Sequence, residues 1–349
     1  MLDGTDRSVG TRALLAAARC AEPFYGLGVR LRNNLYDRGI KAAHDLGKPV
    51  ISVGNITAGG TGKTPTVRWL AEQLLEAGHR PAVLMRGYKS AGGISDEREI
   101  LAKELPGVPI VANPDRVAGA AQALQADPQT TLFILDDGMQ HRRVKRDVNL
   151  VLILAAEPFG FGHLLPRGLL REPLAGLSRA DAFLLTHSGE VDASRIEEIT
   201  QTIRSHNSDA PIFRSDHLIP SLRAVDGSTT DLESVRGKRI YAFCGIGSPA
   251  SFFANLKKAG IDAAQSRAFP DHYAYSGQEW QDIQDAARAA NADILITTEK
   301  DWVKIAPFIS ANPGELRIFR AELSLQFQED HGKQLLNLIQ TKIGPPALH

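Results

Sequence analysis

A lysine and a threonine stand side by side at Lys63 and Thr64, directly after a glycine-rich stretch, and this order of residue types is typical of a phosphate-binding loop. The glycines within residues 54–62 allow backbone N–H groups to close around an anionic phosphate. In such a loop the lysine reaches the β- and γ-phosphates of a nucleotide, and the threonine hydroxyl is a ligand of Mg²⁺. We therefore expect a nucleotide site formed by Thr57, Ala58, Gly59, Gly60, Thr61, Gly62, Lys63 and Thr64.

The segments around this loop are those that a P-loop requires. The apolar run 50–53 predicts a buried strand before it, and Val67, Leu70, Leu74 and Leu75 at helical spacing predict a helix after it. The strict motif has a glycine where Thr57 stands, so the match is incomplete. A flexible loop with a chance Gly-Lys-Thr is the alternative, and the flanking strand and helix argue against it.

A second pair of chemically useful residues, Asp136 and Asp137, ends the apolar run 131–135. This is the Walker B pattern, in which a carboxylate holds Mg²⁺ directly or through water. Because a P-loop is also present, metal binding explains this pair of aspartates better than a solvated strand end does. His141 and the two arginines after it could meet a second, anionic substrate, although an ordinary surface charge cluster remains a serious alternative.

Two adjacent carboxylates, Asp96 and Glu97, follow the strand predicted at 80–85. Open α/β sheets bind ligands beyond the carboxyl ends of their strands, so one of these groups could accept a proton from an attacking hydroxyl. The alternative is a helix N-cap at Ser95 or Asp96, and the motif by itself favours the cap. His272, in an aromatic loop, would by itself be an ordinary surface histidine.

The elements that must position these residues alternate between strand and helix. Further strands are predicted at 109–112, 149–154, 182–186 and 211–213, and the alternation indicates a doubly wound, mostly parallel α/β sheet. Between 149–154 and 182–186 lies the irregular, Gly- and Pro-rich segment 158–173, and long irregular segments inside compact domains are usually functional.

The pattern breaks near residue 226 and restarts at 239, which predicts a second, smaller α/β domain. We expect three parts: residues 1–45, a P-loop core at 46–225, and the smaller domain at 226–349.

Residues 11–45 carry an apolar stripe at steps of three and four, flanked by arginines and by two tyrosines. The periodicity predicts helix, and we expect Pro23 to separate two helices. A basic amphipathic helix with aromatic residues can lie in a membrane interface. Packing of the stripe on the domain core is an equally good explanation, and the residues alone leave the choice open.

Composition excludes several classes of function. The 349 residues contain 40 basic and 40 acidic side chains, so no overall field points to nucleic acid. The two cysteines, Cys20 and Cys244, lack metal-ligand spacing, and a reducing cytoplasm is the simpler assumption. No apolar run approaches the roughly 20 residues that span a bilayer, and the N-terminus lacks a signal-peptide core.

Taken together, these motifs closely resemble those of the tetraacyldisaccharide 4′-kinases, the lipid A 4′-kinases of Gram-negative bacteria. The blocks run in family order over most of the chain. Two departures occur, because the family commonly has Asn in place of Phe161 and Ala-Gly-Pro in place of residues 167–169. The blocks that carry the resemblance are GNITAGGTGKTP (54–65), RGY with SDE (86–97), LDDGMQHRR (135–143), PFGFGHLLPRGLLREPL (158–174), FPDHYAYS (269–276) and TTEKDWVKI (297–305).

The resemblance implies transfer of the γ-phosphate of ATP to the 4′-hydroxyl of a tetraacylated glucosamine disaccharide 1-phosphate, which gives lipid IVA. Lys63 matches the phosphate-binding lysine, and Thr64, Asp136 and Asp137 match positions that bind Mg²⁺. The Thr57 departure also agrees with the family's form of the loop.

The same resemblance implies roles for residues outside the P-loop. Asp96 matches the general base, with Glu97 beside it, and His272 matches a histidine of the second domain that acts near the acceptor hydroxyl. A separate lobe supplying this histidine would make catalysis depend on cleft closure. The substrate-binding residues expected are Arg116, His141, Arg171 and Glu172.

A substrate with four acyl chains lies in the bilayer, so the family favours a membrane-surface role for the N-terminal segment. We expect a peripheral protein on the cytoplasmic face of the bacterial inner membrane, with the lipid disaccharide and an anionic lipid surface as its partners. Neither nucleic acid nor an obligatory protein partner is expected.

Two functions of other classes compete with the kinase. A P-loop GTPase or metallochaperone usually carries an Asn/Thr-Lys-x-Asp motif, and the sequence Thr-Glu-Lys-Asp at 298–301 has a different spacing. A non-catalytic, ATP-dependent switch could use the N-terminal helix to recruit a partner to the membrane. A switch predicts slow ATP hydrolysis that the lipid disaccharide does not change.

Overall fold

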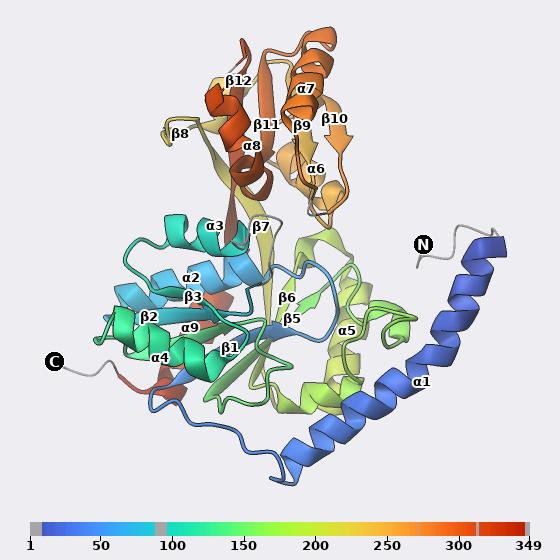
Figure 1. The fold of residues 1–349 in the computed structure, drawn as a ribbon, viewed down its shortest axis with the longest axis vertical. Helices are drawn as coiled ribbons and strands as arrows, with labels where there is room; N and C mark the ends of the chain where they lie inside the picture. Colours follow the sequence, from blue (N-terminus) through green and yellow to red (C-terminus); the bar gives the residue numbers. More distant parts are fainter. Residues whose placement is uncertain (1–8, 88–95, 272, 312–313, 346–349) are drawn as a thin grey trace. The chain divides into compact units, whose positions relative to one another are not determined.

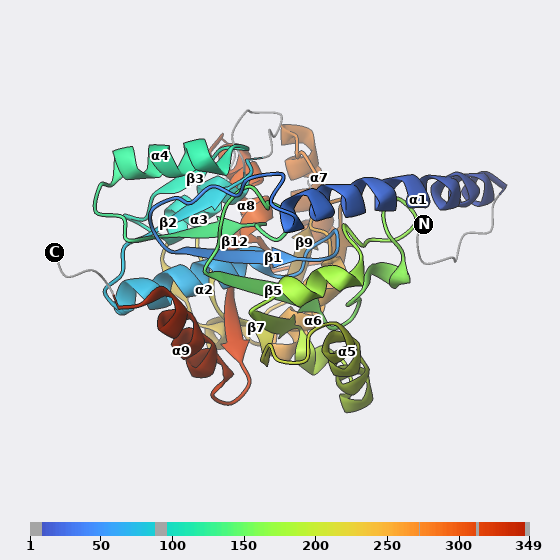
Figure 2. The same ribbon diagram turned by 90° about the horizontal axis from the view of Figure 1, so that it is seen from below.

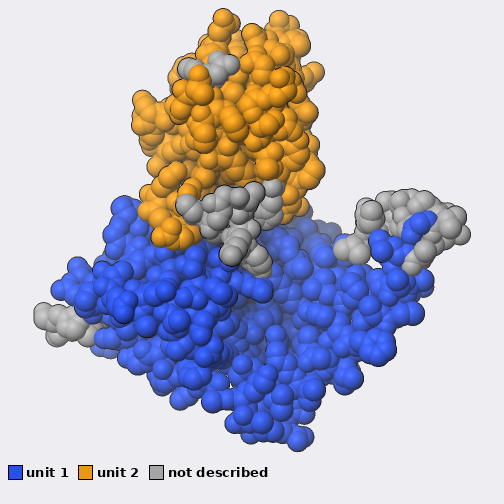
Figure 3. Space-filling view, in the orientation of Figure 1, with its two compact units in different colours: residues 1–87, 105–216, 327–349 blue, residues 88–104, 217–326 orange. Residues whose placement is uncertain are grey.

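The computed structural model describes residues 9–87, 96–271, 273–311 and 314–345. The chain forms two compact units (Figure 3), the first made of residues 1–87, 105–216 and 327–349 and the second of residues 88–104 and 217–326. These units divide the chain at residues other than 45 and 225, and the last 23 residues belong to the first unit. The expected three-part domain division stays a prediction.

The first unit is built on a parallel sheet with the strand order β7-β6-β5-β1-β4-β2-β3. β1 (Val50–Asn55) lies in the interior of this sheet, paired with β4 on one side and β5 on the other. This confirms the expected doubly wound, mostly parallel architecture. The other strands are β2 (Pro81–Met85), β3 (Ile110–Ala112), β4 (Leu132–Asp136), β5 (Val148–Leu154), β6 (Ala182–Thr186) and β7 (Ile212–Arg223).

Helices cover both faces of this sheet, and Figure 2 shows α2 and α4 on opposite sides of it. α2 is the next element after β1 and the P-loop, and it buries Val67, Leu70 and Leu74. Leu75, the fourth apolar residue whose spacing predicted the helix, is 41% exposed. The helices of this unit, besides the N-terminal one, are α2 (Lys63–Glu76), α4 (Arg116–Ala126), α5 (Ala193–His206) and α9 (His331–Ile343), with short 3₁₀ turns at Gly160–Gly162, Leu174–Arg179 and Ser188–Glu190.

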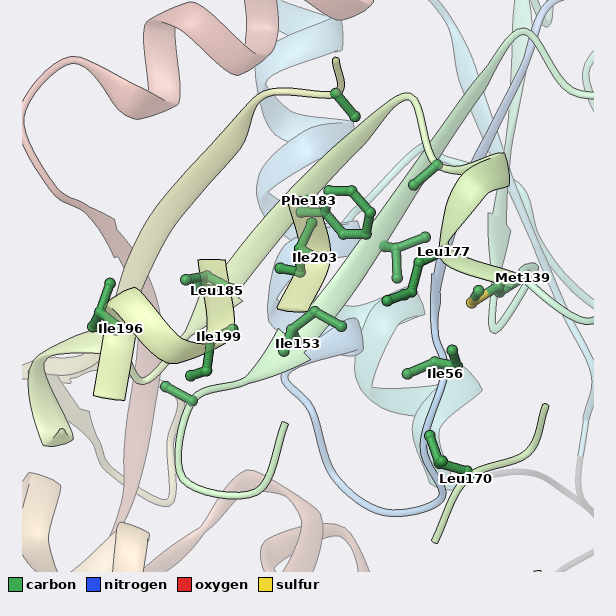
Figure 4. Close-up of a cluster of buried hydrophobic side chains, with 14 residues drawn as sticks. Ile56, Met139, Ile153, Leu170, Leu177, Phe183, Leu185, Ile196, Ile199 and Ile203 are labelled. Atoms are coloured by element: carbon green, nitrogen blue, oxygen red, sulfur yellow. The ribbon is translucent and has the colours of Figure 1, made fainter. Parts of the chain in front are cut away.

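One buried cluster of this unit reaches the loops that carry the predicted site. Ile196, Ile199 and Ile203 of α5 belong to the same apolar cluster as Phe183 and its neighbours on β5 and β6 (Figure 4). Met139, three residues after Asp136, and Leu170, in the irregular segment, are buried in the same cluster. The loop after β4 and the segment 158–173 are therefore fixed by one core.

The N-terminal segment forms a single helix, α1 (Val9–Asp37), at the periphery of the first unit (Figure 1). The expectation that Pro23 separates two helices is wrong, because the helix continues through it. Pro23 and Arg19, one turn earlier, are both exposed, so water can bind the carbonyl that loses its intrahelical partner.

The second unit is a smaller α/β unit whose parallel strands follow the order β10-β9-β11-β12. The larger segment of this unit, residues 217–326, begins within β7 and ends within β12, and β7 is longer than the apolar run 211–213 that predicted it. Its elements are α3 (Asp96–Glu104), β8 (Thr229–Thr230), the 3₁₀ turn Leu232–Val235, β9 (Ile240–Cys244), α6 (Pro249–Lys258), β10 (Ala263–Ala268), α7 (Gly277–Ala289), β11 (Ile294–Thr298), α8 (Glu299–Ala311) and β12 (Arg317–Phe327).

Candidate active site

The glycine-rich loop leads directly into the N-terminus of α2. Gly59 and Gly62 have φ values of 112° and 82°, which L-residues with side chains rarely adopt. Gly62 is the N-cap of the helix, and its carbonyl accepts both the backbone N–H and the hydroxyl of Thr66. Lys63 is the first helical residue, and the first turn contains no acidic side chain. The positive end of α2 is therefore suited to an anionic phosphate.

The first half of the loop is held by the irregular segment 158–173. The Ala58 N–H donates to the Leu169 carbonyl at 2.6 Å, and the Arg171 N–H donates to the Ile56 carbonyl at 2.8 Å. Thr57 lies between these bonds and forms an antiparallel bridge with Leu170. An extended backbone suits threonine better than glycine, which explains why this position departs from the strict motif.

Lys63 connects the loop to the end of β4. Its Nζ donates to Asn55 Oδ1 at 3.2 Å and lies 3.6 Å from Asp137 Oδ1. Asn55 is fully buried at the end of β1, and its amide nitrogen donates to the Thr57 carbonyl at 2.7 Å. The side chain of Lys63 is thus already aimed along the loop toward the two aspartates.

The loop after β4 passes very close to β1. Gly138 donates its N–H to the Val53 carbonyl at 3.0 Å. A Cβ on Gly54 would lie 2.5 Å from the backbone nitrogen of Met139, which leaves no room for a side chain. This close approach brings the aspartates at the end of β4 beside the P-loop.

Asp137 is an ionised carboxylate facing two cations. Burial opposes its ionisation, but the charges of Lys63 and Arg171 outweigh the burial and hold the pKa of Asp137 below its ordinary value. The backbone of Asp137 is left-handed, with a φ of 57°. The chain therefore turns sharply after Asp136, which is buried and is the last residue of β4.

The donor set near the P-loop fits Mg²⁺. Thr64 supplies a hydroxyl, and Asp136 and Asp137 supply carboxylates, which are the hard oxygen ligands that this ion prefers. Across the described part of the chain, no three His, Cys, Asp or Glu side chains gather to form a metal cage. Mg²⁺ usually takes only one or two carboxylates from a protein and its other ligands from phosphate and water.

Two of the expected substrate-binding residues make contacts within the protein. The Nη1 of Arg171 lies 2.7 and 2.9 Å from the two carboxylate oxygens of Asp137. Glu172 is fully buried, and it accepts hydrogen bonds from Gln140 at 3.0 Å, Asn33 at 3.2 Å and Arg179. Their substrate roles stay predictions, and their positions show that both lie against the loop after β4.

The other two expected substrate-binding residues are Arg116, which is buried, and His141, which is partly buried. The Arg116 guanidinium, 2% exposed as a residue, donates to the carbonyls of Asn113 at 3.1 Å and Asp136 at 3.4 Å. Burial, together with the charges of Arg116 and Arg146, lowers the pKa of His141 to about 4. His141 is therefore neutral at pH 7 and would contact a substrate through a hydrogen bond, since it carries no positive charge there.

The predicted acid–base residues are only partly described. α3 begins at Asp96, so the helix that the capping alternative required is present. Ser95, the side chains of Asp96 and Glu97, and the whole of His272 lie outside the described residues. Their catalytic roles stay predictions.

Sequence reasoning missed several residues that build this site. Gln140 donates to the Asn55 carbonyl at 2.9 Å and to Glu172, and the Thr186 hydroxyl at the end of β6 donates to the Thr61 carbonyl at 3.1 Å. Arg146 donates to the carbonyls of Gly138, Met139 and His141. The one available signal was a polar residue, Asn55, two positions after the apolar run 50–53 that predicted β1.

Comparisons with known proteins agree with this geometry. The family model described as Tetraacyldisaccharide-1-P 4′-kinase matches residues 14–340. A tetraacyldisaccharide 4′-kinase of Syntrophus aciditrophicus is 41% identical over 310 residues, covering 81% of this chain and 82% of the relative. A protein of the same name from Halothermothrix orenii is 35% identical, covering 92% and 91%. The crystal structure of LpxK from Aquifex aeolicus in complex with ATP superposes with a TM-score of 0.74 at 29% identity, covering 95% of this chain and 100% of that one.

Proposed function

The chain belongs to the tetraacyldisaccharide-1-P 4′-kinase family, and we propose that it transfers the γ-phosphate of ATP to the 4′-hydroxyl of a tetraacyldisaccharide 1-phosphate, giving lipid IVA in lipid A biosynthesis. One observation within the site carries this reaction. Lys63, at the positive end of α2, lies beside the ionised Asp137 at the end of β4, so a nucleotide phosphate and its metal would meet there.

Phosphoryl transfer requires positioning and charge neutralisation more than covalent chemistry. In our proposal the N–H groups of residues 57–64 hold the β- and γ-phosphates of ATP. Lys63 offsets the negative charge of the γ-phosphate while this group is transferred. Thr64, Asp136 and Asp137 hold Mg²⁺. When bound there, Mg²⁺ would supply positive charge that offsets the negative charge of the nucleotide phosphates.

The acceptor hydroxyl must lose a proton as its oxygen attacks the γ-phosphorus. We assign this proton to the carboxylate of Asp96, with Glu97 beside it, and we place His272 near the acceptor hydroxyl. The bond between the γ-phosphorus and the β,γ-bridging oxygen breaks, ADP leaves, and the phosphate stays on the 4′-oxygen. Arg116, His141, Arg171 and Glu172 are proposed to border the substrate.

The test uses purified protein, Mg-ATP and labelled disaccharide 1-phosphate in detergent micelles. Wild type should form the 4′-phosphorylated product, and Asp96→Ala should lose about 10²- to 10⁴-fold in kcat, since general-base catalysis contributes about that much. Asp285→Ala, which removes an exposed carboxylate from α7, is the matched control and should keep wild-type kcat.

Two outcomes would contradict the proposal. If wild type hydrolyses ATP without phosphorylating the lipid, and Asp96→Ala behaves identically, the non-catalytic switch becomes the better explanation. A clear preference for GTP over ATP would instead favour the P-loop GTPase class.

We further propose that the protein docks peripherally on the cytoplasmic face of the inner membrane through α1. Phe24, Leu27 and Leu31, at steps of three and four on this helix, are 78%, 65% and 59% exposed. The exposure of these three side chains supports a membrane-surface role more than packing of the stripe on the domain core, the alternative left open by the sequence. No helix of the described residues is both long and apolar enough to cross a bilayer.

An exposed apolar stripe beside Arg30 and Arg38 suits an anionic lipid surface. We expect Phe24→Ser, Leu27→Ser and Leu31→Ser, combined, to weaken binding to vesicles containing anionic phospholipid at least tenfold, because each side chain contributes about 1.5–3 kcal/mol when buried. Val225→Ser, which removes an exposed apolar residue from the second unit, is the control. Unchanged vesicle binding by the triple variant would contradict the docking proposal.

A further inference from the structure

We propose that Tyr25 and Asn33 on α1 are positioning residues for phosphoryl transfer, acting on Asp137 and Lys63 through the backbone and side chains of residues 171 and 172. This inference rests on the proposed function, because it gives the N-terminal helix a part in catalysis in addition to membrane docking. All of the residues involved lie in the first unit.

The first connection runs from Tyr25 to Asp137. The Tyr25 hydroxyl donates to the Arg171 carbonyl at 2.9 Å, and the Arg171 guanidinium contacts both carboxylate oxygens of Asp137. The Arg171 N–H donates to the Ile56 carbonyl, so this residue is fixed to the P-loop on its other side. Burial raises the pKa of Tyr25 above its ordinary value, which keeps the hydroxyl protonated as a donor.

The second connection runs from Asn33 to Lys63. Asn33 donates its amide to the buried Glu172, and Glu172 accepts a hydrogen bond from Gln140. The same Gln140 amide donates to the Asn55 carbonyl, and the Asn55 side chain accepts from Lys63 Nζ. Buried networks of this kind fix side-chain positions, since each unpaired polar group would be costly.

α1 has further contacts that do not depend on the side chains of Tyr25 and Asn33. Glu22 accepts the N–H of Leu164 at 3.0 Å and pairs with Arg167 at 3.2 Å. Arg142 donates to the Asn33 carbonyl and pairs with Asp37. Removing a single hydroxyl should therefore leave the helix in place, so that an effect on catalysis can be separated from loss of α1.

The experiment compares Tyr25→Phe with Tyr36→Phe in detergent micelles. Tyr36 lies on the same helix and makes cation–π contacts with Arg142 and Lys41, and among the described residues the structure gives its hydroxyl no hydrogen bond. We expect Tyr25→Phe to lower kcat about fivefold and to raise the Mg²⁺ concentration for half-maximal activity, since one hydrogen bond is worth about 1 kcal/mol. KM for the disaccharide and Tm should change little, and Tyr36→Phe should match wild type.

Two readouts do not depend on activity. Hydrogen exchange of the amides of residues 169–172 should be faster in Tyr25→Phe than in wild type, and Mg²⁺ should strengthen the binding of a fluorescent ATP analogue less in that variant. Asn33→Ala should show the same pattern more weakly, because Glu172 keeps Gln140 and Arg179.

The outcomes separate the two proposals. If wild type is inactive on the lipid, the proposed function fails, and the exchange and ATP-binding readouts still decide the positioning role. If Tyr25→Phe matches wild type in kcat, in Mg²⁺ dependence and in exchange, the positioning role is wrong. Equal losses in Tyr25→Phe and Tyr36→Phe would also overturn it, because a general effect on α1 would then explain both.

Discussion

Asp137 combines an unusual backbone with an unusual electrostatic setting. A left-handed φ of 57° at a residue other than glycine costs energy, and such strain often occurs at functional sites. Its single negative charge faces both Lys63 and Arg171. The local excess of positive charge is suited to a nucleotide, whose phosphates would bring the additional negative charge.

The first residue-scale prediction concerns Lys63. Lys63→Met keeps the length of the side chain and removes its charge, so we expect kcat to fall by about 10²- to 10³-fold, as when one charge-stabilising group is lost. The exposed lysine of α6 gives a matched control, and Lys257→Met should retain wild-type kcat. A Lys63→Met enzyme with normal phosphoryl transfer would contradict the assigned role.

The second concerns His141, whose pKa near 4 in the folded protein lies below the ordinary value of 6.5. The unfolded chain therefore binds this proton first, and stability is full above pH 6.5 and falls as the pH drops from 6.5 toward 4. Besides burial, the charges that act on the pKa of this ring are those of Arg116, Arg146 and Arg143, which lower it, and that of Asp115, which raises it.

Partial solvent exposure limits the effect to about 1–2 kcal/mol. Denaturant unfolding at pH 7 and pH 5 measures it, and His141→Asn should lose less stability between these two values than wild type does. An identical pH dependence in both proteins would show that His141 titrates normally when folded.

At the scale of elements, the site depends on how closely β1 and the loop after β4 approach. The P-loop follows β1, and the two aspartates stand where β4 passes into its loop. The P-loop and the aspartates come together because Gly54 has no side chain. The segment 158–173 then lies against the same loop through its bridge to Thr57 and its buried Leu170. Three separate stretches of chain are thus held together by backbone contacts and one apolar cluster.

We expect Gly54→Ala to destabilise the protein by about 1–3 kcal/mol, because the added Cβ would force the backbone of Met139 to move. The measurement is Tm by calorimetry. Gly28→Ala, in the interior of α1, is the control, since a Cβ there would meet nothing within 4 Å. A Tm for Gly54→Ala equal to that of wild type would mean that the loop can shift freely.

At the scale of the whole molecule, charge and ligand binding determine the expected behaviour. Forty basic residues balance forty acidic ones, so local clusters such as the one around Asp137 provide the attraction for ATP. A ligand that binds only the folded protein stabilises it in proportion to the logarithm of its concentration.

Mg-ATP at about 100 times its Kd should add about 2.7 kcal/mol and raise Tm by roughly 3–6 °C. Mg-GTP at the same concentration should raise it less, because ATP is the proposed phosphate donor. Lys63→Met should show a much smaller shift with Mg-ATP than wild type. Equal shifts with both nucleotides would argue against adenine selectivity in this chain.

The sequence by itself determined the chemistry and most of the local structure. Glycines before Lys63, an apolar run before Asp136, and the alternation of strands and helices follow from local rules, so the P-loop, the Walker B strand and the parallel sheet were predictable. Local rules failed at Pro23, because whether a proline ends a helix depends on how exposed the preceding turn is.

Only the tertiary structure decided which side chains meet. Arg171 and Asp137 are 34 residues apart, and Tyr25 is 146 residues from the carbonyl it contacts. Such pairs depend on sheet order and loop packing, and no spacing in a single sequence encodes them. The same holds for α1, because only the fold shows that Tyr25 and Asn33 contact the protein and that Phe24, Leu27 and Leu31 are exposed.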